Sequence, residues 1–482
     1  MIFLFGDYGV YNRNAALFGL KGLFDKNDVA SQILTPTMDL KLQKNRAAMA
    51  SGFAAGSIWS IYDAFTGRML QEDRRLTPRE YQAPDEYKET AGADSLLYLR
   101  YDGAAIQLVT RIDGTIESVE FLENGHLVKR ENYDDGGYLV TIEYPLGEED
   151  LHTKVVDQRG NNVFELYQVG KYHKVVKVKF VPEDIDFLSE NEFWKWAFER
   201  LVAAKNPSDK FFVVSDAFRK AIQTAEFDKE GVYLLPTALY DENTSKDLMY
   251  DHYEKLIFNS HAELNKVAAV LDEKTESKLY WNNFLAFDKI QPNYESEHFP
   301  VYLNLGTESD TIHFSEVLDF VSKTLVQEPK VHFIIEFSLL RDQVDFLKRL
   351  AETELSNETI KEHVTPLTRP WPERVAEEMA RAILYVHYQN TEVLSLTLST
   401  AIAAEKPILA LPGDALLGDY LRDENGKIIS DTSVARLIKQ AIYDIEFLNY
   451  VAPNPSIVRD IFSGTSAMAR WDTIFEDDET KL

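Results

Sequence analysis

The sequence predicts an α/β protein with two doubly wound Rossmann-like domains facing a cleft and an antiparallel β-sheet insertion in the first. Short apolar runs alternate with segments of helical periodicity near both ends of the chain, which is typical of parallel sheets covered by helices. Between Ser95 and Phe180, about eight runs rich in Val, Ile, Tyr and Leu are separated by turn residues, as in an antiparallel meander. The chain has 482 residues, enough for about three compact units.

The first Rossmann-like domain begins with a buried strand at residues 2–5 that ends before Gly6. Residues 14–24 carry apolar side chains at helical spacing, and residues 31–34 form a second strand. Residues 58–65 resemble a further helix. After the insertion we expect a helix through Trp194 and Phe198, a strand at 211–214, a helix through Phe218, strands at 232–235 and 255–258, and a helix from Ala262 through Val270 capped by Asn259 and Ser260.

Glycine-containing turns divide the insertion into hairpins. Asn-Gly or Asp-Gly between two alternating runs is the strongest short-range hairpin signal. Such turns occur at Asp113-Gly114, Asn124-Gly125, Asp135-Gly136-Gly137 and Arg159-Gly160-Asn161. Edge strands of a long hairpin sheet expose unpaired backbone groups. We therefore expect that an extended Ser/Thr-rich polypeptide or a partner adds a strand there, or else that the sheet is solvated or forms a dimer contact.

A second series of strands and helices follows a polar, proline-containing segment at residues 291–300, which is typical of a hinge. Expected strands lie at 301–305, 331–337, 383–388 and 407–411, and expected helices at 314–325, 339–354 and 392–404. The predicted domains are residues 1–70 and 185–292 for the first Rossmann-like domain, 71–184 for the insertion, 297–465 for the second Rossmann-like domain, and 466–482 for a C-terminal helix and acidic tail.

Composition excludes several classes of function. Lys and Arg total 51 against 79 Asp and Glu, so the formal net charge is −28, and the chain should repel nucleic acid and anionic lipid. There is no cysteine, which excludes disulfides and thiolate chemistry, and the ten histidines show no metal-ligand spacing. Since no signal peptide and no membrane-spanning stretch is evident, we expect a cytoplasmic protein without membrane insertion, metal or cofactor.

A sugar nucleotide bound at the second sheet would need cations or helix N-termini for its diphosphate. Arg369 and Arg374 flank Pro370-Trp371-Pro372 and form the best cationic cluster of that half. The alternative interpretation is a loop with solvated arginines, because no matching lysine motif accompanies them.

Residues 392–411 resemble the nucleotide-sugar segment of retaining glycosyltransferases with the GT-B architecture. In that segment an acidic residue is followed eight positions later by a glutamate, and then by a Gly-Lys-Pro motif. Here Glu392 fills the first acidic position, Thr400 the second, and Glu405 the usual glycine position before Lys406. A hydroxyl cannot replace a carboxylate that holds a nucleotide ribose. The resemblance thus implies a kept fold with an eroded donor site, and no catalytic residue is assigned. If such a site survives, it consists of Arg369, Arg374, Glu392 and Thr400.

The order of a split α/β domain, a hairpin-sheet insertion and a second α/β domain resembles the first accessory secretory protein (Asp-one) family of the accessory Sec system. Blocks that carry the resemblance are Trp59 to Asp63, Tyr133 to Tyr138, Ser399 to Ile408, Asp419 to Leu421, Asn425 to Ile429, Phe462 to Gly464, and Arg470-Trp471. This family implies a GT-B-like fold without transferase activity. It also implies work in the cytosol with companion accessory secretory proteins and a SecA-type motor ATPase on serine-rich repeat adhesins of Gram-positive bacteria.

The resemblance leaves three functions open. The first is a non-catalytic export component that binds adhesin and partners, peripheral at the inner face of the membrane through those partners. A second is the non-catalytic, acceptor-binding subunit of the two-protein N-acetylglucosaminyltransferase that modifies the same adhesins. The third is an active UDP-sugar transferase that uses Arg369, Arg374 and Glu392 as donor ligands.

Overall fold

The computed structural model describes residues 1–6, 8–9, 12–13, 15–36, 53–54, 56–68, 76–91, 96–236, 252–269, 278–282, 289–293, 298–305, 311–337, 339–368, 370, 372–388, 396–410, 417–429 and 434–479. The chain splits into two compact units. The first consists of residues 1–14, 29–234 and 252–254, and the second of residues 15–28, 235–251 and 255–482.

The first unit contains a sheet of parallel strands. β1 (Ile2–Phe5) lies between β16 (Lys210–Val213) and β4 (Ser31–Thr35), β17 (Val232–Leu234) pairs with β16, and β5 (Ile58–Ser60) pairs with β4. Helices α4 (Glu190–Ala203) and α5 (Asp216–Ala221) confirm the expected return of helical pattern. The short strands β2 (Tyr8–Gly9) and β3 (Asn12–Arg13) pair antiparallel.

The predicted helix at residues 58–65 is wrong in its first half. Ile58 and Trp59 pair in parallel with Ile33 and Leu34, and the helix α3 covers only Asp63–Thr66. Burial of Ile58 at 2% exposure in a sheet outweighs the weak local helical pattern of a short apolar run.

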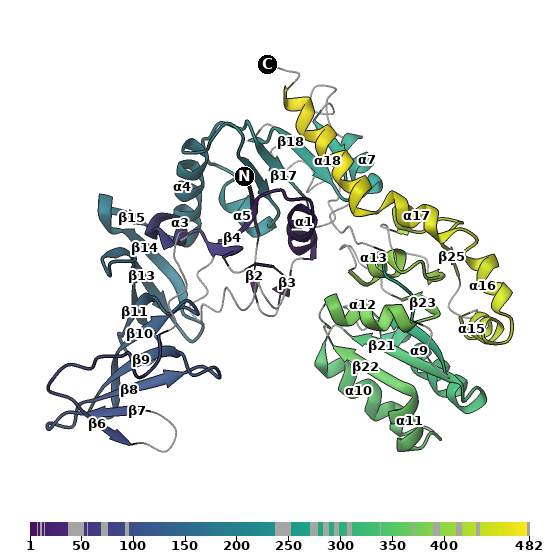
Figure 1. The fold of residues 1–482 in the computed structure, drawn as a ribbon, viewed down its shortest axis with the longest axis horizontal. Coiled ribbons are helices and arrows are strands. Elements are labelled where there is room, and N and C mark those ends of the chain that lie inside the picture. Colours follow the sequence, from purple (N-terminus) through teal and green to yellow (C-terminus); the bar gives the residue numbers. More distant parts are fainter. Residues whose placement is uncertain are drawn as a thin grey trace. The chain divides into compact units, whose positions relative to one another are not determined.

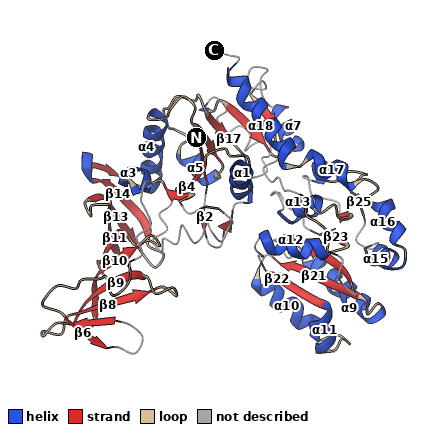
Figure 2. Ribbon diagram, viewed as in Figure 1, coloured by secondary structure: helices blue, strands red, loops and turns tan. Residues whose placement is uncertain are grey.

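The insertion is a ten-stranded antiparallel sheet whose strands follow the order of the sequence (Figures 1 and 2). Glycines with positive φ, between 78° and 82°, stand in the turns at 114, 125, 137 and 160, which confirms the predicted hairpins. Both edge strands are short, which limits uncontrolled pairing. The strands are β6 (Lys88–Ala91), β7 (Leu96–Leu99), β8 (Ala105–Thr110), β9 (Ile116–Glu123), β10 (His126–Tyr133), β11 (Leu139–Pro145), β12 (Leu151–Val156), β13 (Asn162–Val169), β14 (Lys174–Phe180) and β15 (Ile185–Phe187); the 3₁₀ turn η2 (Val181–Glu183) precedes β15.

A buried ion pair attaches this sheet to the parallel strands. Asp63 accepts a hydrogen bond from the Ser60 amide at 2.8 Å and pairs with Arg68 at 3.4 Å, and both side chains are 1% exposed. The Arg68 guanidinium also donates to the backbone oxygens of Val140, at 3.1 Å, and Val156. One cation thus joins the segment after β5 to two strands of the antiparallel sheet.

An aromatic cluster fills the space between α3, α4 and the last strands of the sheet. The Tyr62 ring stacks on Phe193 with centroids 4.5 Å apart and meets Phe164 edge-on at 5.3 Å. Trp196 packs on Phe65 and Phe180 at 5.2 and 4.9 Å. Such pairs stabilise beyond their buried area, by roughly 0.5–1.5 kcal/mol each.

The second unit contains a six-stranded parallel sheet with the order β22-β21-β20-β23-β24-β25. Figure 1 shows α9, α10 and α11 on one side of it and α12 and α13 on the other. The strands are β20 (Phe299–Asn304), β21 (Val331–Phe337), β22 (Val364–Thr368), β23 (Leu384–His387), β24 (Ile408–Ala410) and β25 (Gly426–Ile428), and β18 (Lys255–Phe258) pairs with β19 (Leu279–Trp281). The helices are α1 (Ala15–Lys26), α7 (His261–Ala268), α9 (Thr311–Gln327), α10 (Leu340–Ala351), α11 (Asn357–His363), α12 (Pro372–Arg381), α13 (Leu396–Ala403), α14 (Leu417–Tyr420), α15 (Val434–Tyr443), α16 (Ile445–Val451), α17 (Pro455–Ile461) and α18 (Gly464–Glu479).

Side chains alternate between the two faces of this sheet. Val301 and Leu303 join the apolar core on one face, whereas Tyr302 and Tyr385 lie on the other. The predicted strand at 331–337 is confirmed residue by residue as β21. The sequence does not predict β22, because Pro366 weakens the strand pattern. β22 is an edge strand, where proline is tolerated.

Replacing Arg68 should destabilise the protein strongly. In Arg68→Met, a buried Asp63 loses its counter-charge and two buried carbonyls lose a donor, so we expect the free energy of unfolding to fall by about 3–5 kcal/mol in urea titration. Arg100→Ala, which removes the exposed Arg100–Asp102 pair on the same sheet, should change it little. Equal effects of the two substitutions would contradict the role given to Arg68.

Glu190 should make stability depend on pH. Burial raises the pKa of Glu190 to about 7 from its usual 4.5, although Tyr62 donates a hydrogen bond to it at 3.2 Å. The folded state therefore binds more protons than the unfolded state between these values, so stability falls as pH rises from about 4.5 to about 7. Glu190→Gln should remove this slope and gain about 1–3 kcal/mol above pH 7, measured by urea unfolding at several pH values. Parallel pH profiles of the two proteins would disprove the assignment.

Candidate functional site

The second parallel sheet has one topological switch point. β20 is followed along the chain by β21 on one side, while β23 lies on its other side. Open α/β sheets bind ligands at such a point, outside the carboxyl ends of the strands. Here those ends carry Asn304, Glu336 and His387, from β20, β21 and β23.

Polar side chains at this switch point bond to one another. The hydroxyl groups of Tyr302 and Thr397 both donate to the Glu336 carboxylate, each at 2.7 Å. The hydroxyl of Tyr385 lies 2.8 Å from Nδ1 of His387, whose side chain is 0% exposed. Burial raises the pKa of Glu336, and the two donated hydrogen bonds oppose that rise. We call these five side chains the switch-point cluster.

The switch-point cluster carries an acidic group where a diphosphate would need a donor or a cation. Its carboxylate already accepts two hydrogen bonds from the protein, and its two tyrosines are fully buried. The chain segments that follow β20, β23 and β24, at residues 306–310, 389–395 and 411–416, lie outside the described residues.

Two of the four predicted donor-site residues, Arg369 and Glu392, also lie outside the described residues. Thr400 is in α13, 1% exposed, and its hydroxyl donates to the backbone oxygen of Leu396 at 2.7 Å. That hydroxyl is used within its own helix. The donor site therefore stays a prediction.

Arg374, the fourth predicted residue, lies in α12. Its guanidinium bonds to Glu378 and lies 3.3 Å from Glu377. It borders a cavity of about 400 Å³ together with Pro300, His332 and Thr365, which come from the first halves of β20, β21 and β22. In the described residues, Arg374 thus lines the amino-terminal side of the sheet, and the switch-point cluster lies at the carboxyl ends.

Glu405 occupies a backbone position that favours glycine. Its φ is +53°, in the left-handed region. The amide of Glu405 donates to the oxygen of Ile402, and that of Lys406 to the oxygen of Ala401, both at 3.0 Å. These two bonds form a Schellman motif at the end of α13. The Glu405 carboxylate pairs with Arg459 and, at 3.4 Å, with Lys289.

The blocks near the C-terminus meet around α7. Asp419 accepts a hydrogen bond from the His261 amide at 2.8 Å and lies 3.3 Å from its Nδ1, and the imidazole stacks on Trp281 at 4.2 Å. Arg470 lies 4.5 Å from the centre of the same indole. Burial and the nearby Asp419 raise the pKa of Glu263 to about 8. Sequence reasoning missed His261 and Glu263, because their partners are more than 150 residues away.

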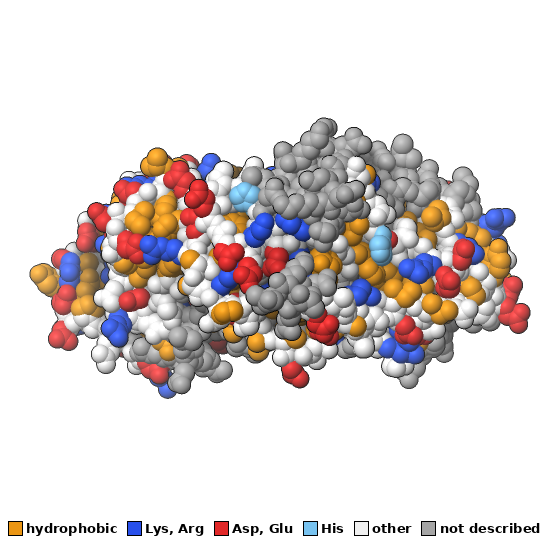
Figure 3. All heavy atoms as spheres, turned by 90° about the horizontal axis from the view of Figure 1, so that it is seen from above, with side chains coloured by type: hydrophobic (Ala, Val, Ile, Leu, Met, Phe, Trp, Pro, Cys, Tyr) orange, Lys and Arg blue, Asp and Glu red, His pale blue; other side chains and the backbone are white. Residues whose placement is uncertain are grey.

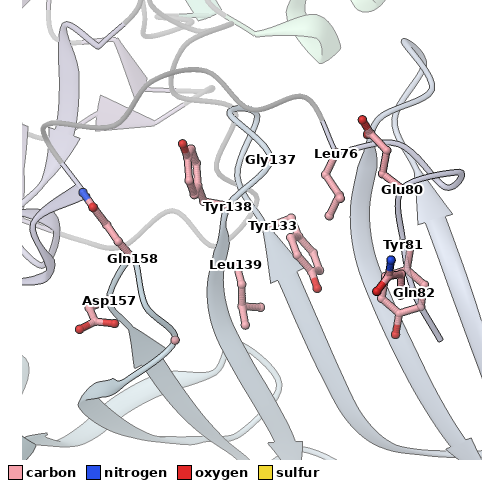
Figure 4. Close-up of a pocket in the computed structure, with 11 residues that line it drawn as sticks. Leu76, Glu80, Tyr81, Gln82, Tyr133, Gly137, Tyr138, Leu139, Asp157 and Gln158 are labelled. Carbon is pink, nitrogen blue, oxygen red and sulfur yellow. The ribbon is translucent and has the colours of Figure 1, made fainter. Parts of the chain in front are cut away.

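A polar pocket of about 440 Å³ opens on the antiparallel sheet in the first unit (Figure 4). Tyr133, Tyr138 and Leu139 line it from the β10–β11 hairpin, and Glu80, Tyr81 and Gln82 from the segment before β6. Asp157 and Gln158 come from the β12–β13 turn. We call it the tyrosine pocket. In the sequence, the block from Tyr133 to Tyr138 carries only the family resemblance and no local signal of a pocket.

Two further findings concern the described residues. No group of three His, Asp or Glu side chains among them could hold a metal ion. None of the helices that they form combines the length and apolar character needed to cross a membrane. Figure 3 shows acidic and basic side chains interspersed over one face of the molecule.

No protein-family model matches the chain, and no curated protein matches it. Solved structures do. A chain in the structure of accessory secretory proteins 1, 2 and 3 of Streptococcus pneumoniae matches with a TM-score of 0.70 and 13% identity over 100% of both chains. Pneumococcal O-GlcNAc transferase GtfA, solved with UDP and GlcNAc, matches with a TM-score of 0.74 and 16% identity over 99% of this chain and 98% of that one. A chain of a GtfA/B complex matches with a TM-score of 0.73 and 13% identity over 99% of both.

These likenesses confirm the predicted fold class. The chain has a GT-B-like fold with parallel sheets and an antiparallel sheet insertion, and it shares that fold with an accessory secretory protein as the sequence resemblance implied.

The stability of variants at position 405 should depend on the left-handed backbone conformation of that residue. Glu405→Gly and Glu405→Ala both lose the ion pairs, but only glycine avoids the steric conflict of a β-carbon at positive φ. We expect the glycine variant to be more stable than the alanine variant by about 1 kcal/mol in urea unfolding. Identical stabilities would mean that the end of α13 does not impose this conformation.

Proposed function

We propose that this protein is a non-catalytic component of the accessory Sec export system that assists export of serine-rich repeat glycoprotein adhesins by binding substrate and partner proteins. The full-length likeness to an accessory secretory protein, at 100% coverage of both chains, carries the proposal. The companion accessory secretory proteins and a SecA-type motor ATPase are the proposed partners, in the cytoplasm at the inner face of the membrane.

The switch-point cluster supports a role without transfer chemistry. A bound diphosphate would need donors or cations there, whereas Glu336 accepts two hydrogen bonds from Tyr302 and Thr397 and offers the diphosphate neither. Thr400, at the position of the ribose-binding carboxylate in the resembled enzymes, donates its hydroxyl to its own helix. A net charge of −28 further disfavours capture of a free dianion from solution.

A second candidate is the acceptor-binding, non-catalytic subunit of the two-protein N-acetylglucosaminyltransferase. The likeness to a chain of the GtfA/B complex over 99% of both chains favours it. The two candidates differ in the partner that should assemble with the protein.

Calorimetry with UDP-GlcNAc and UDP-glucose tests the absence of a donor site. We expect no binding heat and no release of UDP, with pneumococcal GtfA, which was solved with UDP and GlcNAc, as the positive control. UDP-sugar binding with turnover would overturn the proposal. Arg369 and Glu392 would then be the residues to replace, since Arg374 lines the amino-terminal side of the sheet.

Co-expression decides between the two non-catalytic candidates. We expect the chain to co-purify with the second and third accessory secretory proteins of its own system. Because it is strongly acidic, contacts with basic partner surfaces should weaken as salt rises. Co-purification with a GtfA-type transferase alone would support the acceptor-binding subunit instead.

A further inference from the structure

We propose that the tyrosine pocket binds a neutral sugar residue carried on the exported polypeptide. This inference rests on the proposed function, since it names the ligand class for a protein that handles glycosylated adhesin. It concerns the antiparallel sheet of the first unit, whereas the switch-point cluster belongs to the second unit.

Turn chemistry holds the first wall of the pocket. The Asp134 amide donates to the Tyr138 oxygen at 2.9 Å, and the Tyr138 amide donates to the Asp134 carboxylate at 2.8 Å. Gly137 has φ +82° and completes the turn. Tyr133 and Tyr138 therefore lie on either side of a closed turn (Figure 4), and both residues are half-buried.

The second wall is the segment before β6, which is tied down at several points. The Ile116 amide donates to the Leu76 oxygen at 2.9 Å, and Leu76 packs into an apolar cluster with 7% exposure. Glu80 accepts hydrogen bonds from both the amide and the hydroxyl of Thr77, at 2.8 and 3.0 Å. Tyr81 lies beside the ring of Tyr98, 6.2 Å between centroids. The pocket is thus built before any ligand arrives.

The lining of the pocket selects against anions. Glu80 and Asp157 line it, and none of its described lining residues is Lys or Arg. Asp157 already accepts bonds from the amides of Arg159 and Asn161, both at 2.8 Å, so its charge is satisfied locally. A phosphate or carboxylate would meet repulsion, and a cation would find carboxylates that are already hydrogen-bonded.

Neutral polar groups remain for a ligand. Within the described part of the chain, the hydroxyls of Tyr81 and Tyr138 and the side-chain amide of Gln82 have no hydrogen-bond partner. Burial raises the pKa of Tyr81, so its hydroxyl stays protonated and able to donate. Aromatic faces next to hydroxyl and amide groups match a pyranose, which has an apolar face of C–H groups and a rim of hydroxyls. A volume of about 440 Å³ is within the range of small-molecule pockets.

Binding to a glycopeptide tests the inference. The probes are a serine-containing peptide carrying O-linked N-acetylglucosamine, the same peptide without sugar, and a lysine-containing peptide of equal length, each titrated into the full chain by calorimetry. We expect the glycopeptide to bind at least tenfold more tightly than either other peptide. Tyr138→Ala and Gln82→Ala should each weaken glycopeptide binding at least several-fold, the tyrosine variant by tenfold or more.

Tyr172→Ala is the matched control, because Tyr172 is a tyrosine in another turn of the same sheet and is 89% exposed. It should bind the glycopeptide as the unsubstituted protein does. Gln82 is exposed, so its substitution tests the pocket even where Tyr138→Ala unfolds. Equal binding of glycopeptide and plain peptide, preference for the lysine peptide, or unchanged binding by both pocket variants would each overturn the inference. Co-purification of the Gln82→Ala protein with the companion proteins tests the proposed function separately, because assembly with those partners does not require the pocket.

Discussion

The antiparallel sheet depends on one buried cation. Arg68 is 1% exposed; it pairs with Asp63 and donates hydrogen bonds to the backbone oxygens of Val140 and Val156. These partners offset the free-energy cost of burying its charge. The same few residues after β5 place Tyr62 in the aromatic cluster with Phe193 and Phe164. The ion pair and hydrogen bonds of Arg68 thus fix the position of the antiparallel sheet, and the aromatic cluster supplies the buried apolar surface. The tyrosine pocket inherits its rigidity from this attachment, because Val140 and Val156 lie in the strands next to its two turns.

The second sheet keeps the architecture of a nucleotide-binding fold while its polar groups satisfy one another. Glu336 receives two hydroxyl donors from the protein itself, and His387 contacts a tyrosine hydroxyl. At the end of α13 the backbone still follows the path that glycine favours, although the residue is Glu405. That glutamate compensates through ion pairs with Arg459 and Lys289.

The proposed roles assign different surfaces to different ligands. The tyrosine pocket offers aromatic faces and neutral hydrogen-bonding groups to a sugar, whereas the acidic surface as a whole favours basic or neutral protein partners. Hydrogen bonds within each wall hold the tyrosine pocket in shape, so binding of a sugar needs little rearrangement of the protein. The short edge strands of the same sheet remain the place where strand addition by a polypeptide is predicted.

The sequence alone determined the features that depend on near neighbours. Hairpin turns at Gly114 and Gly125, and the strand at 331–337, follow from turn chemistry and from runs of apolar residues, so they were predicted in place. Tertiary structure decided the remaining features, because contacts between distant residues outweigh local conformational preference. Ile58 lies in a strand and not in a helix because it pairs with Ile33. Thr397 reaches Glu336 across 61 residues only because β23 pairs with β20 and α13 follows β23 along the chain. The tyrosine pocket likewise consists of the segment before β6, the β10–β11 hairpin and the β12–β13 turn, which no local sequence pattern places together. The strand order of the sheet and the contacts of Arg68 bring these segments together.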